Sequence, residues 1–349
     1  MNRSHTHDLE PGTRMTGIHT EHNHQPPNDP QHAADLTPDE AKDLVERLRQ
    51  NIRQVYIGNT TAIDRLIVCL LARGHVLIED VPGVGKTVLA TALARSLDCT
   101  FSRVQLTPDM LPADVLGVSV YDSNTGEFNF KQGPIFANIL LADEINRTTP
   151  RTQSALLESM QEATVSIDGR VIKLEQPFMV VATQNPFEFE GTYLLPENQL
   201  DRFLMRISLG YPTPEAEAQV LNQRPSESKL TELLPVTDQS DVLRLQALTD
   251  RVRIDDEIVQ YIIRLANATR EHRDLRIGLS PRGTLALAQA ARATAVLDGR
   301  DYCVPEDVVN NIEPVCGHRI VSRTYLQTGD QSSGLETLRE VMREVTAPA

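Results

Sequence analysis

Five short runs of apolar residues recur in the first two thirds of the chain, and segments with helical spacing separate them. Each run is largely continuous, as is typical of strands covered on both faces of a sheet. Helical segments between successive runs favour right-handed crossovers and a parallel sheet, so the predicted fold class is α/β. The runs are HVLIE, FSRVQL, ANILLADE, FMVVATQ and LMRISLG, at residues 75–79, 101–106, 137–144, 178–184 and 204–210.

Two stretches interrupt this rhythm by alternating around a turn. Residues 118–130 alternate around Asn124-Thr125-Gly126, and residues 164–174 alternate around Asp168-Gly169. Each pattern predicts a β-hairpin inserted into the core.

The pattern also indicates where the ordered chain begins and where it changes character. Thr37, Pro38 and Glu40 form a helix-start signal with a capping box. Beyond residue 212 the pattern is that of helices alone. We therefore expect an α/β core with inserted hairpins over residues 37–212 and a smaller helical domain over residues 213–349.

Residues 1–36 differ in composition from everything that follows. Six of the nine histidines lie there, among Pro, Asn, Asp and Thr and with almost no large apolar residues. Such a segment buries too little to offset the entropy of ordering it, so we expect a disordered tail. Histidine-rich tracts can bind metal, and this alternative stays open.

Charge and cysteine usage restrict the class of protein further. The chain has 34 Lys and Arg against 48 Asp and Glu, a net charge of -14. An acidic chain is not expected to bind nucleic acid through its overall charge. No apolar run approaches the ~20 residues of a membrane span, the N-terminus lacks an apolar signal core, and the four cysteines form no C-x-x-C. We expect a soluble, cytoplasmic, reduced protein.

The sequence EDVPGVGKT follows the first apolar run and opens a helix, which is the context of a phosphate-binding loop. Its glycines let backbone N–H groups face an anion, and the helix N-terminus favours negative charge. Lys86 is expected to reach the β- and γ-phosphates and Thr87 to offer its hydroxyl to Mg²⁺. Asp80 stands where the usual pattern has glycine. The expected nucleotide-binding residues are Asp80, Val81, Pro82, Gly83, Val84, Gly85, Lys86, Thr87 and Val88.

Polar residues at the ends of two later apolar runs complete a candidate hydrolytic site. Asp143 can hold Mg²⁺, and Glu144 is then placed to orient and polarise the attacking water. Asn185, at the end of the next run, can hydrogen-bond both that water and the γ-phosphate.

Phosphoryl transfer also needs cationic side chains, and two arginines are candidates. Arg282 lies in the first turn of a helix, where the helix dipole disfavours a cation, so a nearby anion would explain it. Arg202 precedes the last apolar run. It could be structural and paired with Asp201 or Glu197, or it could point to the nucleotide of a neighbouring subunit, which we favour.

These motifs together resemble those of the MoxR family of AAA+ ATPases. The matching segments are EDVPGVGKT, GPIFANILLADEINR, QSALLESMQE, VATQNP, EGTYLLPENQLDRF and LSPRGTLALAQAARA. The resemblance extends from about Thr37 to the C-terminus. In that family the acidic residue before P-G-x-G-K-T is usual.

The resemblance implies a role for each motif. Lys86 and Thr87 would form Walker A, and Asp143 and Glu144 Walker B. Asn185 would be sensor 1, Arg282 sensor 2 and Arg202 the arginine finger, with Arg206 a rival for the last. The hairpin at residues 118–130 would be the helix-2 insert, and the hairpin at residues 164–174 would precede sensor 1.

The resemblance also implies an assembly and an activity. Members usually form hexameric rings with ATP and Mg²⁺ between subunits, work with a von Willebrand factor A domain protein, and act like chaperones on client complexes. A finger acting in trans needs a head-to-tail interface, and such interfaces close into rings. We expect the helical domain to be a lid that carries Arg282 onto the γ-phosphate.

Two other functions are compatible with a phosphate loop. A nucleic-acid motor would be expected to carry basic residues in its inserted hairpin, whereas YDSNTGEFNFK has two acids and one lysine. A metabolite kinase would not need Glu144, Asn185 and a lid with Arg282 in this order. The sequence therefore favours an ATP-driven remodelling protein.

Overall fold

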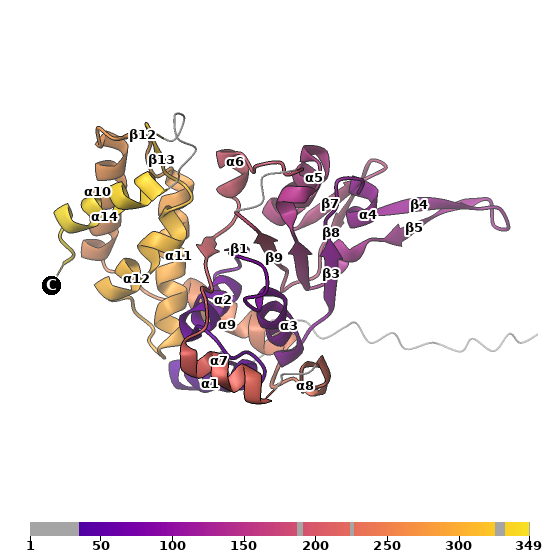
Figure 1. The fold of residues 1–349 in the computed structure, drawn as a ribbon, viewed down its shortest axis with the longest axis horizontal. Helices are drawn as coiled ribbons and strands as arrows, with labels where there is room; N and C mark the ends of the chain where they lie inside the picture. The colour runs from indigo at the N-terminus through magenta and orange to yellow at the C-terminus, as the bar shows by residue number, and fades with distance from the viewer. Residues whose placement is uncertain (1–34, 187–190, 224–226, 325–331, 349) are drawn as a thin grey trace, which may run out of the picture. The chain divides into compact units, whose positions relative to one another are not determined.

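A five-stranded parallel sheet in the order β10-β1-β9-β6-β3 lies at the centre of the protein (Figure 1). This is a computed structural model, and it describes residues 35–186, 191–223, 227–324 and 332–348. The strands are β1 (Val76–Glu79), β3 (Phe101–Gln105), β6 (Ile139–Asp143), β9 (Met179–Gln184) and β10 (Met205–Ile207). They coincide with the five apolar runs, which confirms the predicted parallel sheet.

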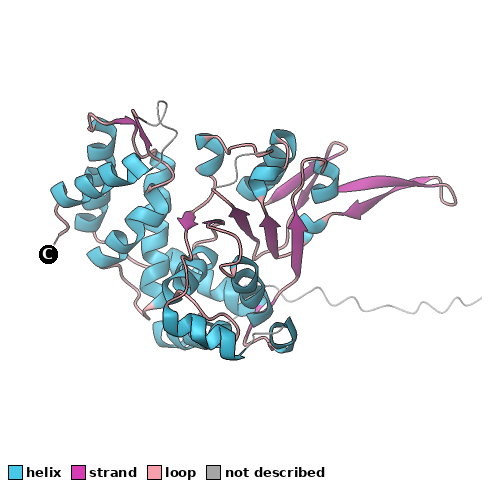
Figure 2. Cartoon of the chain, in the orientation of Figure 1, coloured by secondary structure: helices cyan, strands magenta, loops and turns pink. Residues whose placement is uncertain are grey.

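Helices cover both faces of this sheet (Figure 2). Because side chains alternate along a strand, Val76 and Ile78 of β1 enter one core and Leu77 enters the other. The first core also takes in the helices α1 (Pro38–Arg53), α2 (Thr60–Leu71) and α3 (Lys86–Ser96). The second core contains buried residues of α5 (Pro150–Glu162). The predicted capping box at Thr37 and Glu40 is present at the start of α1.

Both predicted hairpins are confirmed. One is formed by β4 (Gly117–Asp122) and β5 (Glu127–Gln132), and it reaches away from the sheet in Figure 1. The other is formed by β7 (Thr164–Ile167) and β8 (Arg170–Lys173). The hydroxyl of Ser119 donates a hydrogen bond to the Asp168 carboxylate over 2.5 Å, which joins the two hairpins. Short helices complete this region: α4 (Pro112–Leu116), η2 (Pro134–Phe136), η3 (Ile145–Arg147) and α6 (Glu197–Leu200).

The chain after residue 212 is mainly helical. Its helices are α7 (Pro214–Gln223), α8 (Glu227–Glu232), α9 (Gln239–Arg251), α10 (Asp256–Glu271), α11 (Pro281–Leu297), α12 (Pro305–Cys316) and α14 (Ser332–Glu344). The expectation of helices alone was wrong in detail. Within the described residues, β11 (Thr237–Asp238) pairs with β2 (Leu97–Asp98), and β12 (Leu275–Ile277) pairs with β13 (Val321–Ser322). These strands have only two or three residues each, too few to produce a visible alternation.

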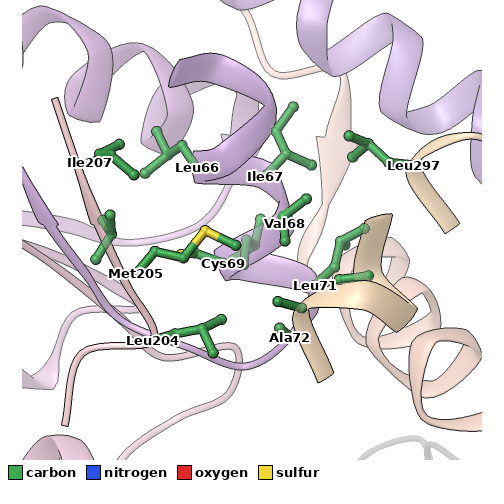
Figure 3. Packing of buried hydrophobic residues seen from close by; sticks show 14 of the residues in the cluster. Leu66, Ile67, Val68, Cys69, Leu71, Ala72, Leu204, Met205, Ile207 and Leu297 are labelled. Carbon is green, nitrogen blue, oxygen red and sulfur yellow. The ribbon is translucent and has the colours of Figure 1, made fainter. Parts of the chain in front are cut away.

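The sheet and the C-terminal helices share one continuous core. Figure 3 shows Met205 of β10 beside Cys69 of α2, and Leu297 of α11 on the side of α2 where Ile67 lies. Burial raises the pKa of the Cys69 thiol, which fits an inert core residue. The division of the chain at residue 212 stays a prediction.

The packed chain begins slightly before the predicted start. Leu36 is buried in the first core, and Asp35 forms an ion pair with Arg251 at 2.6 Å. Residues 1–34, to which the prediction of a disordered, histidine-rich tail mostly applies, lie outside the described residues. No helix in the described part of the chain is both long and apolar enough to cross a bilayer.

Candidate active site

The candidate site lies at the carboxyl edge of the sheet, where parallel strands place their chain ends together. The phosphate loop follows β1, Asn185 follows β9, and Asp143 and Glu144 end β6. The segments that the sequence singled out separately are therefore brought to one edge, because β1, β9 and β6 are neighbours.

The phosphate loop has the backbone that its glycines allow. Gly83 and Gly85 have φ of 86° and 91°, a left-handed conformation that favours glycine. Gly85 immediately precedes α3, so the free N–H groups of the first turn face the loop. A Cβ atom at Gly85 would come within 3.3 Å of the Tyr56 ring, so the N-terminal segment also packs against the loop. Sequence analysis missed Tyr56, which no motif marks.

Lys86 is held inside this loop by backbone carbonyls. Its Nζ donates to the carbonyl oxygens of Asp80 at 2.7 Å and Gln184 at 3.2 Å. Burial lowers the pKa of Lys86, and the surrounding carboxylates of Glu79, Asp80, Asp143 and Glu144 oppose that shift. The ammonium group is thus positioned at the centre of the candidate site.

The carboxylate of Asp80 supports the loop. One oxygen accepts a hydrogen bond from its neighbour Val81 N at 2.8 Å. The other accepts three, from the Ser208 hydroxyl at 2.8 Å, Leu209 N at 2.8 Å and Gly210 N at 2.7 Å. Burial alone would raise the pKa of Asp80, but these four donors lower it. The acid at this position therefore ties the phosphate loop to the segment that leaves β10 for the helical domain.

The Walker B acids are both held by side chains from the edge strand β3. Asp143 accepts from Arg103 Nε at 2.8 Å and from the Thr183 hydroxyl at 3.1 Å. Glu144 accepts from Gln105 Nε2 at 2.7 Å, and its Oε2 lies 3.1 Å from Arg147 Nε.

The backbone at Glu144 turns sharply, with φ of 59°, and its N–H donates to the Thr183 hydroxyl at 3.0 Å. Arg103, Gln105 and Thr183 were not predicted. Arg103 and Gln105 could have been predicted from their spacing of two residues in β3, which places both side chains on the same face of that strand.

Asn185 lies half-buried just beyond β9. Its backbone carbonyl accepts a hydrogen bond from Asn146 Nδ2 at 3.4 Å, and Asn146 follows the Walker B acids. The two strand ends are thus connected through their asparagines.

Arg202 and Arg282 meet at the opposite edge of the sheet. They line one open pocket of about 410 Å³ together with Gly74 and His75, which precede β1. The phosphate loop follows the other end of β1, so the strand, about 13 Å long at about 3.3 Å per residue, separates them from Lys86. Arg282 was expected to be carried onto a γ-phosphate, which stays a prediction; in this structure it lies away from the phosphate loop of its own chain. Sequence periodicity places residues on faces but does not give the direction in which a whole domain packs.

The two guanidinium groups share a distinctive environment. Neither makes a hydrogen bond or an ion pair among the described residues, and Arg282 is exposed. Asp201, one of the predicted structural partners of Arg202, instead pairs with Arg319 at 2.7 Å. Arg206 pairs with Glu79 at 3.2 Å and its side chain is mostly buried. The rival candidate Arg206 is therefore committed within its own chain, whereas the guanidinium groups of Arg202 and Arg282 have no partner among the described residues.

His75 supports the floor of that pocket. Its Nδ1 accepts from Val180 N at 3.0 Å, and its Nε2 lies 2.8 Å from the Met160 carbonyl, to which it must donate. Burial lowers the pKa of His75 to about 4, and the charge of Arg282 acts in the same direction. The ring is neutral at neutral pH and fixes β1, β9 and α5 relative to one another.

Comparison with known proteins adds independent evidence. The model of the ATPase family associated with various cellular activities (AAA) matches residues 75–205, and that of the AAA lid domain matches residues 267–344. Chaperone MoxR1 of Mycobacterium tuberculosis is 41% identical over 316 residues, covering 87% of this chain and 82% of its own. The chain belongs to the MoxR family of AAA+ ATPases. The family resemblance noted in the motifs is confirmed, and with it nucleotide binding and ATP hydrolysis.

Other relatives agree with this assignment over most of their length. Uncharacterized protein YeaC of Bacillus subtilis is 45% identical, covering 87% of this chain and 95% of its own. Protein MoxR of Methylorubrum extorquens is 30% identical, covering 88% and 96%. A crystal structure of a proposed ATPase from Cytophaga hutchinsonii has a TM-score of 0.81 at 35% identity and covers 89% of this chain and 97% of its own. The core-plus-lid fold of this MoxR-family ATPase is therefore shared by these relatives.

Proposed function

We propose that this MoxR-family ATPase hydrolyses ATP at sites shared between neighbouring subunits of a ring and uses that cycle to remodel client protein complexes. The observation that carries the proposal is the common pocket of Arg202 and Arg282, at the edge of the sheet opposite the phosphate loop. Within the described part of the chain neither guanidinium has a partner, since the nearby Asp201 carboxylate is paired with Arg319, and two such cations fit the phosphates of another subunit's nucleotide. Head-to-tail contacts of this kind close into rings, and we propose a hexamer.

In this proposal each chain contributes two different halves of a site. Lys86 binds the β- and γ-phosphates, Glu144 orients and polarises water, and Asn185 hydrogen-bonds that water. Arg202 and Arg282 of the neighbour stabilise the charge that develops on the γ-phosphate. Gln105 and Arg147 must release Glu144 for this role, since both now occupy its carboxylate.

The oxygen donors of the site fit Mg²⁺. The Thr87 hydroxyl and the buried Asp143 carboxylate are hard ligands, and Mg²⁺ commonly uses one or two such groups together with phosphates and water. Among the described residues no cluster of three or more His, Cys, Asp or Glu could hold a metal by itself. Mg²⁺ would supply charge neutralisation at the phosphates, so Thr87 and Asp143 are its proposed protein ligands.

The composite site is tested by mixing two inactive variants. Arg202→Ala keeps its own phosphate loop, and Lys86→Ala keeps its own arginine. Each alone should be inactive, since loss of an arginine finger costs about 10³–10⁵ in rate. Mixed rings contain interfaces with one intact loop and one intact arginine, so activity should partly return. If subunits are shown to mix and activity stays absent, the trans assignment is rejected.

The hairpin formed by β4 and β5 supports a protein client. Tyr121 and Phe128 are paired across the strands with ring centroids 5.3 Å apart, and they are 57% and 70% exposed. Exposed aromatic residues of this kind are typical of protein-binding surfaces. A von Willebrand factor A domain protein is the partner we propose from the family resemblance.

A photo-crosslinking amino acid at Phe128 tests this client against the nucleic-acid alternative. Crosslinked products from cell extract should keep their size after nuclease treatment. Adducts that are instead removed by nuclease would favour a nucleic-acid motor. The same substitution at the exposed Leu221 of α7 provides the background level of crosslinking.

A further inference from the structure

Arg319, in the turn between α12 and β13, is a buried arginine that reaches from the helical domain to the segment carrying Arg202. Its Nε donates to the Asp201 carboxylate at 2.7 Å. Its two terminal nitrogens donate to the carbonyls of Phe203 at 2.6 Å and Leu204 at 3.0 Å, and one lies 3.3 Å from the Asp201 carbonyl. The guanidinium therefore holds the chain on both sides of Arg202.

The chemistry of this contact depends on an arginine. Arg319 is 6% exposed, and removing a cation from water is costly unless its donors find partners. Burial lowers the pKa of Arg319, and the Asp201 carboxylate opposes that shift. A planar guanidinium can donate to several acceptors in fixed directions at once, which a lysine ammonium on a flexible stem cannot reproduce. Most of its acceptors belong to residues 201–204.

The same side chain packs against the first turn of α11, next to Arg282. A Cβ atom at Gly283 would lie 2.9 Å from Arg319 Cδ and 2.5 Å from Leu279 Cδ1. Glycine is thus required there by close approach. The N-cap Ser280 accepts from Gly283 N at 3.0 Å and fixes this turn. Arg319 therefore lies between the two elements that carry the unpaired arginines.

We infer that Arg319 is a positioning residue that places Arg202 and Arg282 together for the nucleotide of the neighbouring subunit. The inference rests on the proposed trans site. Arg319 reaches the wall of the same pocket, but it is only 6% exposed and its guanidinium donates to Asp201 and to backbone carbonyls, so it acts through those residues. Its effect is to fix the backbone of residues 201–204 and the start of α11 in one arrangement.

The test mixes an Arg319 variant with Lys86→Ala or with Arg202→Ala and asks which of the two restores ATP hydrolysis. Arg319→Lys should bind a fluorescent ATP analogue as the unmodified protein does and should hydrolyse ATP about 100-fold more slowly, because misplacing a reacting group by about 1 Å has that effect. Activity should return on mixing with Lys86→Ala, which supplies a well-placed arginine. It should stay low on mixing with Arg202→Ala, since every interface then lacks one.

A purely structural role predicts a different class. A general defect would damage the variant's own loop, so mixing with Lys86→Ala would restore nothing, and that result overturns the inference. Normal hydrolysis by Arg319→Lys also overturns it. The matched control is Arg300→Lys, which changes a bidentate ion pair with Asp307 (2.7 Å) elsewhere in the helical domain and should keep full activity.

Two further variants keep the inference testable if Arg319→Lys fails to fold. Asp201→Asn removes the counter-ion, and Gly283→Ala pushes on the side chain from the other direction. Both should fall in the class of Arg202→Ala, and normal activity in both contradicts the inference. Failure of the cross between Lys86→Ala and Arg202→Ala would instead reject the shared site, so the two failures are distinguishable.

Discussion

At the scale of single residues, the acids of the candidate site are held by hydrogen bonds from neighbouring side chains. Those neighbours lie outside the sequence motifs. Lys86, Asp143 and Glu144 were predicted from the sequence, and the structure brings them to one edge of the sheet. Their partners Arg103, Gln105 and Thr183 come from β3 and β9. These partners hold both acids at the strand end, and Glu144 must leave Gln105 before its carboxylate can act on water.

Glu144→Gln should bind ATP but fail to hydrolyse it. The amide keeps the shape and the hydrogen bond to Gln105, but it cannot polarise water as a carboxylate does. Phosphate release should fall by at least about 100-fold, at the lower end of the usual contribution of a general base. A binding titration run alongside is the control, and turnover at the normal rate would remove Glu144 from this role. Glu162→Gln, at the C-terminal end of α5, makes the same chemical change outside the candidate site and is the matched control variant.

His75 should make the protein less stable as the pH falls from 7 to 5. The unfolded histidine takes up a proton near pH 6.5, whereas the folded one does so only at about pH 4. The unfolded state therefore binds more protons in this window. The contribution of His75 to the free energy of unfolding is fully present above about pH 6.5 and decreases as the pH falls toward 4. The loss is about 1.4 kcal/mol per pH unit between these values.

Urea unfolding at several pH values measures this effect. Buried His318, whose pKa burial also lowers, adds a contribution of the same sign. His75→Gln, which can still donate to Met160, should flatten the pH dependence. His272→Gln, which changes a half-buried histidine of the helical domain, is the matched control. Equal slopes in both variants would contradict the role assigned to His75.

At the scale of elements, the connection from β10 to the helical domain is fixed to the phosphate loop. Asp80 accepts hydrogen bonds from three consecutive residues, Ser208, Leu209 and Gly210. On the adjacent position, Glu79 pairs with Arg206 of β10. Two neighbouring acids at the end of β1 therefore hold the strand beside them and the chain that leaves it.

Asp80→Ala should destabilise the protein by several kcal/mol, because the backbone N–H groups of Leu209 and Gly210 lose their acceptor. Each buried donor left without a partner costs about 1–3 kcal/mol of folding free energy. Ser208→Ala, which removes a single hydroxyl donor, should cost about 1 kcal/mol. Chemical unfolding of both variants measures the difference. If the two changes cost the same, the backbone donors contribute little and the carboxylate does not hold the segment.

At the scale of the whole molecule, one core joins the sheet to the C-terminal helices. Residues from α2, β10, α11 and α12 all belong to it. The helical domain is therefore not loosely attached in this structure, and the Arg319 contacts strengthen the connection. A cycle of ATP binding and hydrolysis would have to move subunits relative to one another as well as the lid within a subunit.

Two truncations test where the packed chain begins. Removing residues 1–34 should leave the melting temperature and ATPase activity unchanged, since that stretch has almost no core-forming residues. Removing residues 1–36 should lower the melting temperature, because Leu36 is buried and Asp35 pairs with Arg251. Thermal unfolding compares the pair directly. A large decrease with the shorter deletion would show that the tail packs.

The sequence by itself determined the elements and the chemistry that rests on local motifs. The five strands, both hairpins, the capping box at Thr37 and the loop around Lys86 all follow from period, turn residues and spacing. These signals are local, because side-chain alternation and left-handed glycines act within a few residues along the chain.

Only the tertiary structure decided which distant residues meet. It placed Arg282 beside Arg202 at the edge opposite Lys86, gave Asp80 its partners at residues 208–210, and buried Arg319 between Asp201 and Gly283. These contacts join residues 36 to 130 positions apart in the chain. Their geometry is set by how the helical domain packs on the sheet, for which the periodicity of a single segment carries no information.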